Sequence, residues 1–280
     1  PLPRFTAAPA VNFLISIRSL MFRVMSVDGG EISKALKVVL EKVKAATAAR
    51  TPPESEWCED PRLVAVTKTK PKEMVIEAYL AGQRHFAENY VQELVTKAHD
   101  KEVLERCPDI RWHMIGPMQS NKSKKVLSVP NLYAVETVHS EKLATQLNSI
   151  WSTLEDKLEE RLKVFVQVNT SNEAQKSGVP TDEVTHLTEH IINSCPALKL
   201  IGIMTIGAFD HDLSKGPNPD FQRLLQCRAA VCEHHALQPQ DVELSMGMSS
   251  DFEHAISVGS TNIRVGSCIF GARSYPTTAT

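Results

Sequence analysis

Residues 62–71 read RLVAVTKTKP, and this stretch decides which fold the rest of the chain has to complete. Its first half is apolar and β-branched, which is typical of a buried strand, and Pro71 stands where a helix can begin. Between them, Lys68 ends the strand and presents an amine at its carboxyl end. This amine is either a solvated surface charge or a nucleophile that burial tunes to form a Schiff base with a carbonyl compound.

Downstream of this stretch, apolar strand candidates alternate with helical stretches. The predicted strands are residues 63–67, 84–88, 112–115, 132–135, 162–168, 200–204, 242–245 and 262–265. The predicted helices between them are residues 72–80, 90–98, 123–127, 140–158, 182–192, 220–234 and 252–257. Eight strands in strict alternation with helices predict the α/β class and a single closed (β/α)8 TIM barrel. An open doubly wound sheet is the main alternative, but no Gly-x-Gly-x-x-Gly follows the first strand.

Two segments precede the barrel pattern. Residues 31–50 place apolar side chains at helical spacing, which predicts an amphipathic helix that flanks the core. Residues 1–27 contain three Arg but no Asp or Glu, which is typical of a mitochondrial transit peptide or of a disordered extension. We therefore divide the chain into an extension at 1–27 and a barrel at 28–280. We expect the protein in the cytoplasm or, through the extension, in the mitochondrion.

The composition narrows the class of partner. A chain of 280 residues with 42% hydrophobic content can bury a large core as one domain. The net charge of -2 gives no general attraction to nucleic acid or to an anionic membrane, and we expect neither as a partner. The run Lys122, Lys124 and Lys125 is interpreted as a solvated helix face. The six cysteines show neither a Cys-x-x-Cys pair nor zinc-ligand spacing, so we expect no metal and a reducing compartment.

Two loops at predicted strand ends carry features that suit an anion. The seventh strand leads into SMGMSSD at 245–251, where Ser249 offers a hydroxyl at the start of a helix. The eighth strand leads into RVGS at 264–267, where Gly266 permits close backbone approach and Ser267 adds a hydroxyl. Either loop alone is explained by a helix cap and a turn. In a closed barrel, however, the two loops are neighbours of each other and of the first strand, at the place where this fold commonly binds phosphate.

A phosphate site beside Lys68 indicates a phosphorylated carbonyl cofactor. Pyridoxal 5'-phosphate (PLP) fits this description, with its phosphate in the two loops and its aldehyde at Lys68. Arg264 alternates with Val265 on the eighth strand, so we expect its side chain to point into the barrel mouth near the pyridine ring. A guanidinium there opposes protonation of the ring nitrogen and weakens the electron sink on which most PLP chemistry relies.

Several long motifs resemble those of the YggS/PROSC family of pyridoxal phosphate homeostasis proteins. The matching segments, in the same order as in the family, are VAVTKTKP at 64–71, FAENYVQE at 86–93, WHMIGPMQSNK at 112–122, LSMGMS at 244–249 and the stretch at 259–271. The resemblance covers roughly residues 31–275. It implies a single barrel with bound PLP, similar to the N-terminal domain of alanine racemase.

The resemblance also implies a set of cofactor-binding residues, namely Lys68, Asn89, Ser249, Arg264, Gly266 and Ser267. Lys68 resembles the lysine that forms the Schiff base, and the two serines and the glycine resemble the phosphate ligands. Arg264 resembles the residue that faces the pyridine nitrogen, and Asn89 resembles a polar neighbour of the cofactor.

Three further polar residues lie near these positions in the sequence. Lys70 does not match the lysine that carries the cofactor, and we expect a solvated or ion-paired side chain that tunes the site. His113 and Glu88 end two predicted strands and could border the site as proton-transfer groups. A single His at a strand end is more often a hydrogen-bonded structural residue, so we assign His113 no catalytic role.

The choice between enzyme and carrier depends on a second base. A racemase on this barrel needs acid/base groups on both faces of the substrate carbon, and alanine racemase supplies one of them from a tyrosine in another domain. The sequence stops at Thr280, directly after the predicted barrel, so we expect no such domain and assign no catalytic residue. We therefore expect a non-enzymatic, monomeric PLP-binding protein of vitamin B6 homeostasis that buffers PLP and supplies it to apo-enzymes. The alternatives are a PLP-dependent amino-acid racemase-like enzyme and a protein-interaction barrel that PLP regulates.

Overall fold

In the computed structural model, eight parallel strands close into a barrel within the described part of the chain. The structure describes residues 30–52, 60–155, 160–171, 173, 177–208, 211–212, 214 and 216–272. The strands are β1 (Arg62–Val66), β2 (His85–Glu88), β3 (Arg111–Met114), β4 (Leu132–Val138), β5 (Leu162–Gln167), β6 (Leu198–Met204), β7 (Glu243–Ser245) and β8 (Asn262–Val265). The predicted closed barrel is confirmed, and each predicted strand overlaps an observed one.

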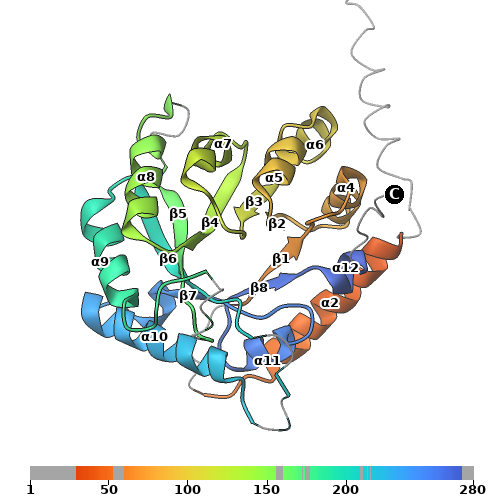
Figure 1. Ribbon diagram of the computed structural model, residues 1–280. Coiled ribbons are helices and arrows are strands. Elements are labelled where there is room, and N and C mark those ends of the chain that lie inside the picture. The colour runs from red at the N-terminus through yellow and green to blue at the C-terminus, as the bar shows by residue number, and fades with distance from the viewer. Residues whose placement is uncertain are drawn as a thin grey trace, which may run out of the picture.

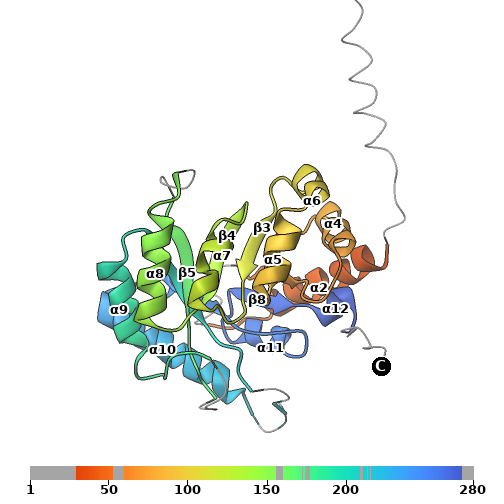
Figure 2. The ribbon, with the colours of Figure 1, turned by 45° about the horizontal axis from the view of Figure 1, so that its top comes forward.

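Helices form an outer ring around these strands, as Figures 1 and 2 show. The α-helices are α2 (Glu31–Ala48), α4 (Lys72–Leu80), α5 (Val91–Ala98), α6 (Lys101–Arg106), α7 (Ser123–Leu127), α8 (Glu141–Trp151), α9 (Val184–Ser194), α10 (Pro219–His235), α11 (Phe252–Ser257) and α12 (Ser267–Phe270). Among the described residues, the short 3-10 helices η1 (Ser120–Lys122) and η4 (Pro239–Asp241) interrupt the connections. The predicted flanking helix at 31–50 is α2, which lies beside α11 and α12 and so joins the two ends of the described chain (Figure 1).

Closure of the barrel brings the first and last strands together. β1 pairs in parallel with β8, with Val64 opposite Arg264, and on its other edge with β2, with Ala65 opposite Phe86. β7 pairs with β8 in turn, with Ser245 opposite Asn262. The carboxyl ends of β1, β2, β7 and β8 therefore meet at one rim of the barrel, which is the rim where TIM barrels place their sites.

The two faces of each strand have different surroundings. Outward side chains such as Leu63, Phe86 and Trp112 join one large apolar cluster between strands and helices. Inward side chains form two small apolar clusters instead, Val64, Val66, Ala87 and Ile115 in one, and Ala134, Phe165, Ile201 and Met204 in the other. The inside-outside alternation follows from the period-2 geometry of a strand, and it is interrupted where the pairing registers of β3 to β6 shift.

The helix predictions fail at one boundary and miss two short helices. The predicted helix at 140–158 ends at Trp151, because the hydroxyls of Ser152 and Thr153 donate to the carbonyls of Ser149 and Ile150 and compete with further helical hydrogen bonds. α6 was not predicted, although Asp100 accepts from the amides of Glu102 and Val103 as its N-cap. α12 was not predicted because its four residues are too few for a periodic pattern.

Some of the predictions concern residues that the structure does not describe. The extension at 1–27, with its transit-peptide interpretation, lies outside the described residues, as does Cys58. The other five cysteines are free thiols. Within the described ranges, no helix combines the length and apolarity that a membrane crossing requires. No group of three potential metal-ligating side chains was found there either.

Candidate functional site at the barrel mouth

Lys68 directly follows β1 on the inward-facing side of the strand. Arg62 contacts the Tyr133 ring inside the barrel, 5.2 Å from its centroid, and Val64 and Val66 belong to an interior cluster. The Thr67 amide donates to the carbonyl of Ala87 at 3.0 Å, so strand pairing continues beyond the end of β1. Lys68 therefore has the same orientation as the interior residues and stands half-buried at the carboxyl-end rim.

A buried lysine on α5 braces the turn that carries Lys68. The Lys97 amine donates to the carbonyl of Thr67 at 2.8 Å, and it lies 2.6 Å from Glu88 Oε1 and 3.0 Å from Glu93 Oε2. Glu93 Oε2 also accepts from the Thr69 amide at 2.8 Å. Thr69 has a φ of 62°, a left-handed conformation that is costly for a residue with a β-branched side chain. The brace therefore holds a strained turn in place.

The carboxyl group of Glu88 lies on the α5 side of β2, where it bonds Lys97 and accepts from the Thr67 hydroxyl at 2.7 Å. Burial raises the pKa of Glu88 to about 7, and the opposing effects of Lys97 and Thr67 do not cancel it. Among the described residues, Glu88 Oε2 is buried without a hydrogen-bond partner. Glu88 thus supports the turn after β1 from behind, and its charge changes near neutral pH.

Ser249 and Gly266 are brought into contact at the rim. The Gly266 amide donates to Ser249 Oγ at 3.1 Å, so the loop after β7 touches the loop after β8. A Cβ atom at Gly266 would stand 3.1 Å from the carbonyl oxygen of Val66, a tight contact, so the absence of a side chain eases the close approach to β1. Ser267 is exposed and begins α12. The two predicted loops and the end of β1 therefore share one small region.

Arg264 lies inside the barrel, with only 4% of its surface exposed. Its Nη1 donates to Ser245 Oγ at 2.5 Å, and its Nη2 donates to the carbonyl of Thr205 at 2.6 Å. Burial lowers the pKa of Arg264 below its ordinary value, although Glu136 and Asp251 oppose the shift. A guanidinium is nevertheless a cation at every physiological pH, and it can only donate hydrogen bonds. The rim therefore holds a buried donor.

Asn89 follows β2 in phase with the interior residues His85 and Ala87. Its side-chain oxygen Oδ1 is buried and has no hydrogen-bond partner among the described residues. Its backbone is closely packed, because a Cβ atom at Gly116 would collide with the carbonyl oxygen of Asn89. A buried acceptor without a donor is costly, so this atom is suited to a ligand with a donor group or to a water molecule.

The remaining polar residues considered from the sequence lie elsewhere. Lys70 donates from Nζ to the carbonyl of Ala272 at 2.6 Å, which ties the turn after β1 to the segment after α12. His113 is fully buried in the barrel interior, bonded to Glu136 and to His85, both at less than 3 Å. Neither residue shares a hydrogen bond with the loops at Ser249 and Gly266 in the contacts of the described chain.

Sequence reasoning missed the residues that hold the site from behind. Glu136 and Ser245 support Arg264 from the interior, and Lys97 supports the turn after β1. A signal existed for Glu136, which is a carboxylate inside the mostly apolar strand β4. A weaker one existed for Lys97, because it shares the buried face of α5 with Leu94 and Ala98.

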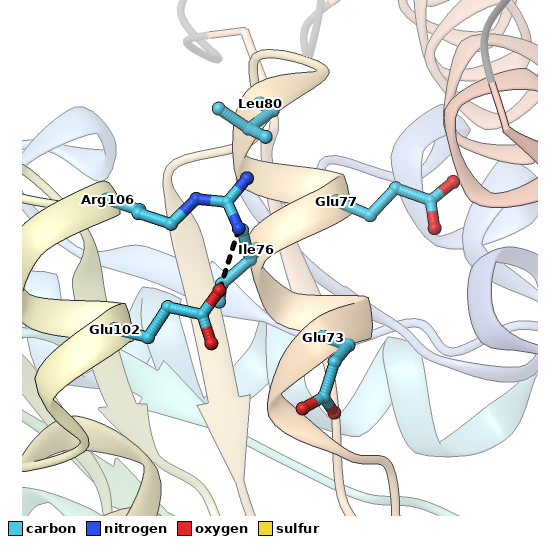
Figure 3. A pocket seen from close by; sticks show the side chains of 6 residues that line it. All are labelled: Glu73, Ile76, Glu77, Leu80, Glu102 and Arg106. Atoms are coloured by element: carbon cyan, nitrogen blue, oxygen red, sulfur yellow. Dashed lines mark hydrogen bonds and ion pairs between the residues drawn. The ribbon is translucent and has the colours of Figure 1, made fainter.

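A separate pocket lies on the outer helix layer between α4 and α6. Its lining residues are Glu73, Ile76, Glu77, Leu80, Glu102 and Arg106 (Figure 3). Arg106 bonds Glu102 across one wall at 2.8 Å. None of the predicted cofactor-binding residues lines this pocket, so it is a surface groove distinct from the barrel mouth.

Comparison with known proteins defines the class of this barrel. The family model described as "Alanine racemase, N-terminal domain" matches residues 54–274. The chain also resembles the solved alanine racemase of Clostridium difficile, with 14% sequence identity, a TM-score of 0.59, and coverage of 88% of this chain and 58% of that chain. At this identity the likeness concerns the fold alone. The fold is therefore the barrel of the alanine racemase type.

Closer relatives place the chain within this class. It is 55% identical over 251 residues to the "Pyridoxal phosphate homeostasis protein" of Bos taurus, covering 90% of each chain. It is also similar to the structure of PipY of Synechococcus elongatus with PLP bound, at 29% identity and a TM-score of 0.66, covering 86% of this chain and 100% of that chain. The chain thus belongs to the YggS/PROSC family of pyridoxal phosphate homeostasis proteins, as its motifs indicated.

Proposed function

We propose that this protein binds PLP at the barrel mouth and takes part in intracellular PLP homeostasis without being an enzyme. The observation that carries the proposal is the meeting, at one rim, of the half-buried Lys68, the bonded pair Ser249 and Gly266, and the buried Arg264. Support comes from the PipY relative, whose structure holds PLP, and from the curated relatives that bear the homeostasis name.

The residues present fit this cofactor. PLP supplies a reactive aldehyde that a lysine amine can attach covalently. Lys68 is the amine that would hold it, because it stands at the rim on the inward side of β1. Ser249, Gly266 and Ser267 would hold the phosphate, since the loops that carry them meet at this rim and offer hydroxyls and backbone amides to an anion. The buried Oδ1 of Asn89 has no partner among the described residues and could accept a hydrogen bond from the ring substituents.

Arg264 favours binding over turnover. It would face the pyridine nitrogen with N–H groups only, so the nitrogen would act as an acceptor and resist protonation. An unprotonated ring draws electrons poorly, which disfavours the carbanion chemistry of racemases and aminotransferases. We therefore infer a carrier that keeps the aldehyde attached and releases PLP to apo-enzymes. The acceptor enzymes would be proteins whose PLP-binding lysine is empty.

A spectroscopic experiment tests the cofactor and its anchor. The full chain is loaded with PLP, freed of excess by gel filtration, reduced with borohydride and digested for peptide mapping. We expect a visible band and a reduced adduct on Lys68. Lys68→Ala should lose the band, whereas Lys70→Ala should keep it, because the Lys70 amine is engaged with Ala272. An adduct spread over surface lysines, or retained by Lys68→Ala, would contradict the proposal.

A transfer experiment tests homeostasis and separates a carrier from an enzyme. The loaded protein is mixed with a PLP-dependent apo-enzyme in the presence of a phosphatase that destroys free PLP. Recovery of the acceptor's activity above that obtained with the same amount of free PLP supports a carrier. Steady interconversion of D- and L-amino acids that Lys68→Ala abolishes would instead identify a racemase and reject the non-enzymatic role.

Two further proposals concern the oligomeric state of the protein and its location in the cell. We propose a monomer, which size-exclusion chromatography with light scattering of the loaded protein checks. We also propose a cytoplasmic location with import into mitochondria through residues 1–27. Fusion of these residues to a fluorescent reporter tests the second proposal, and a reporter that stays outside mitochondria would reject import.

A further inference from the structure

A chain of hydrogen bonds crosses the barrel interior behind Arg264. Arg264 Nη1 bonds Ser245 Oγ at 2.5 Å, and Ser245 Oγ bonds Glu136 Oε2 at 2.6 Å. On the other side, Glu136 Oε1 lies 2.6 Å from His113 Nδ1. The chain continues from His113 Nε2 to His85 Nδ1 at 2.8 Å, and from His85 Nε2 to Arg111 Nη1 at 3.2 Å. It therefore links the rim to the amino-terminal ends of β2 and β3.

The direction of every bond in this chain is fixed by its two arginines. Arg111 can only donate, so His85 Nε2 must accept, and a neutral His85 then carries its proton on Nδ1 and donates to His113. His113 in turn carries its proton on Nδ1 and donates to Glu136. From the rim, Arg264 donates to Ser245, and Ser245 donates to Glu136. Both halves of the chain thus end as donors on one carboxylate.

Glu136 suits this position as an anion. It is fully buried, and Asn262 Nδ2 adds contacts of 3.2 Å to both of its oxygens. Burial opposes its charge, but the hydrogen bond from His113, the Arg264 cation and the Ser245 hydroxyl outweigh it, so the pKa of Glu136 lies below its ordinary value. Burial, with His113 and Arg62, lowers the pKa of His85 to about 2, which agrees with its role as a neutral donor.

A chain of charged and hydrogen-bonded side chains is unusual inside a TIM barrel. TIM barrels normally fill their interior with branched apolar side chains, and buried ion pairs seldom add stability beyond what apolar residues would give. Arg264 is bonded to a hydroxyl and a carbonyl within the described chain, and its compensating negative charge stands one hydroxyl away at Glu136. The free-energy cost of burying these charged groups is explained if the orientation and effective charge of Arg264 matter to what the rim binds.

We propose that Glu136 and Ser245 are positioning residues, which hold Arg264 in its orientation and set the positive charge that it presents to the PLP ring. His113 and His85 fix Glu136 from the opposite side. The inference rests on the proposed PLP site, and it adds residues that do not touch the cofactor. It makes the barrel interior the part of the protein that tunes the bound cofactor.

The charge of Glu136 has a consequence that can be measured. With Glu136 ionised, part of the Arg264 positive charge is compensated at the rim. Glu136→Gln removes the compensation, and its amide cannot accept from both His113 and Ser245 as the carboxylate does. The bare cation should then make the bound cofactor harder to protonate. Since unit charges a few ångströms apart interact appreciably even in a polar medium, the pH midpoint of the visible band should fall by about one unit.

The first experiment is a pH titration of the visible band of the loaded protein. Glu136→Gln should move the midpoint to lower pH by about one unit, a tenfold loss of proton affinity. Glu136→Asp keeps the charge, so its pH midpoint should lie close to that of the wild-type protein. Other charged or titratable groups near Arg264 and Glu136 are Asp251 in the loop after β7, His113 on β3, and at the far end Arg62, Arg111, Tyr133, Lys163 and Glu243. These remain unchanged in both variants.

A matched control separates tuning from loss of structure. Thr188 on α9 is fully buried in the outer layer, where its hydroxyl donates to Thr185 and contacts His235, so Thr188→Val should cost stability and leave the midpoint unchanged. Ser245→Ala removes the bridge and should weaken PLP binding. The proposal is overturned if Glu136→Gln leaves the midpoint unchanged, or if Thr188→Val moves it equally.

A second measurement needs no PLP. Nitrogen-15 NMR of the histidine rings of the unloaded protein at pH 7 should show His85 and His113 as Nδ1–H tautomers, with the His113 signals altered in Glu136→Gln. Rings in the Nε2–H form would reject the chain itself. If the wild-type protein shows no cofactor band, the proposed function fails. The NMR measurement of the histidine tautomers still tests the interior hydrogen-bond chain independently.

Discussion

The inside of the barrel and the layer between its strands and helices are built by the same eight strands, yet they differ in chemistry. The outer layer is one continuous apolar cluster, in which Phe86, Trp112 and Leu94 are fully buried. The interior carries a charged and hydrogen-bonded chain beside two small apolar clusters. The outward faces of the strands thus contribute mainly to stability, whereas the inward faces also orient polar groups at the rim.

The largest expected effect comes from the outer layer. Phe86 is fully buried there, with its ring centroid 6.0 Å from that of Trp112. Phe86→Ala should lower the free energy of unfolding by about 3–5 kcal/mol, because a buried ring is lost and a cavity remains. Urea denaturation measures the loss, with Phe86→Leu as a milder control. The pH midpoint of the bound cofactor should not move, and a shift equal to that of Glu136→Gln would show that the outer layer also tunes the cofactor.

The next effect concerns pH and the carboxyl group of Glu88. Its pKa is raised in the folded protein from 4.5 to about 7, so the folded state holds a proton that the unfolded state releases between these values. Stability from this group is therefore complete below about pH 4.5 and is lost as pH rises through 7, by up to about 3 kcal/mol. Glu88→Gln cannot titrate.

The measurement is the free energy of unfolding of both proteins between pH 5 and 8. The wild-type protein should lose stability relative to Glu88→Gln as the pH rises. His85 changes in the opposite sense, because its lowered pKa costs stability as the pH falls below 6.5, but it is present in both proteins and cancels in the difference. A constant difference across this range would show that Glu88 stays ionised throughout.

A smaller effect is expected from the brace behind Lys68. Lys97→Met removes the amine that joins the carbonyl of Thr67 to Glu88 and Glu93. The turn should loosen and the dissociation constant for PLP should rise about tenfold, or about 1.4 kcal/mol. Protonation of Glu88 limits the loss of stability, since its pKa is already about 7. The matched control is Lys101→Met on α6, an exposed lysine paired only loosely with Glu105.

Fluorescence titration with PLP measures the dissociation constants of the wild-type protein, Lys97→Met and Lys101→Met. Equal affinities of the wild-type protein and Lys97→Met would mean that Lys68 does not depend on the brace. The outer layer would then contribute to stability and not to PLP binding.

The smallest effect is expected at the surface. Lys42 on α2 and Glu253 on α11 form an ion pair at 2.8 Å with about half of each side chain exposed. Water and salt screen such a pair, so Lys42→Ala should leave the melting temperature within experimental error. Differential scanning calorimetry at low and high salt checks this, and a clear loss would show that α2 is held by charge as well as by packing.

Much of the fold could be predicted from the sequence because its signals are local. Alternation of apolar runs with helical stretches gave all eight strands, and small residues at 245–251 and 264–267 marked the loops that meet at the rim. Arg264 was expected to point inward from its place on β8. The end of α8 was mispredicted, because local hydroxyl competition at Ser152 and Thr153 does not alter the apolar pattern.

The supporting contacts could not be predicted in this way. Glu136 meets Asn262 across 126 positions of sequence, and Arg264 meets the carbonyl of Thr205 across 59. No periodic pattern connects such residues, because the closure of the barrel alone decides which strand interiors face one another. Lys97 reaches Thr67 for the same reason, since the packing of α5 against the barrel sets that distance.

By itself, the sequence determined that this chain forms a single barrel, that Lys68 ends its first strand, and which loops lie beside it. The reason is that backbone periodicity and turn chemistry act over a few residues. Only the tertiary structure decided that Arg264 is held by Ser245 and Glu136, and that Lys97 braces the turn from outside. These are contacts between distant segments, and their free energy is gained only when closure excludes water and brings the charges together.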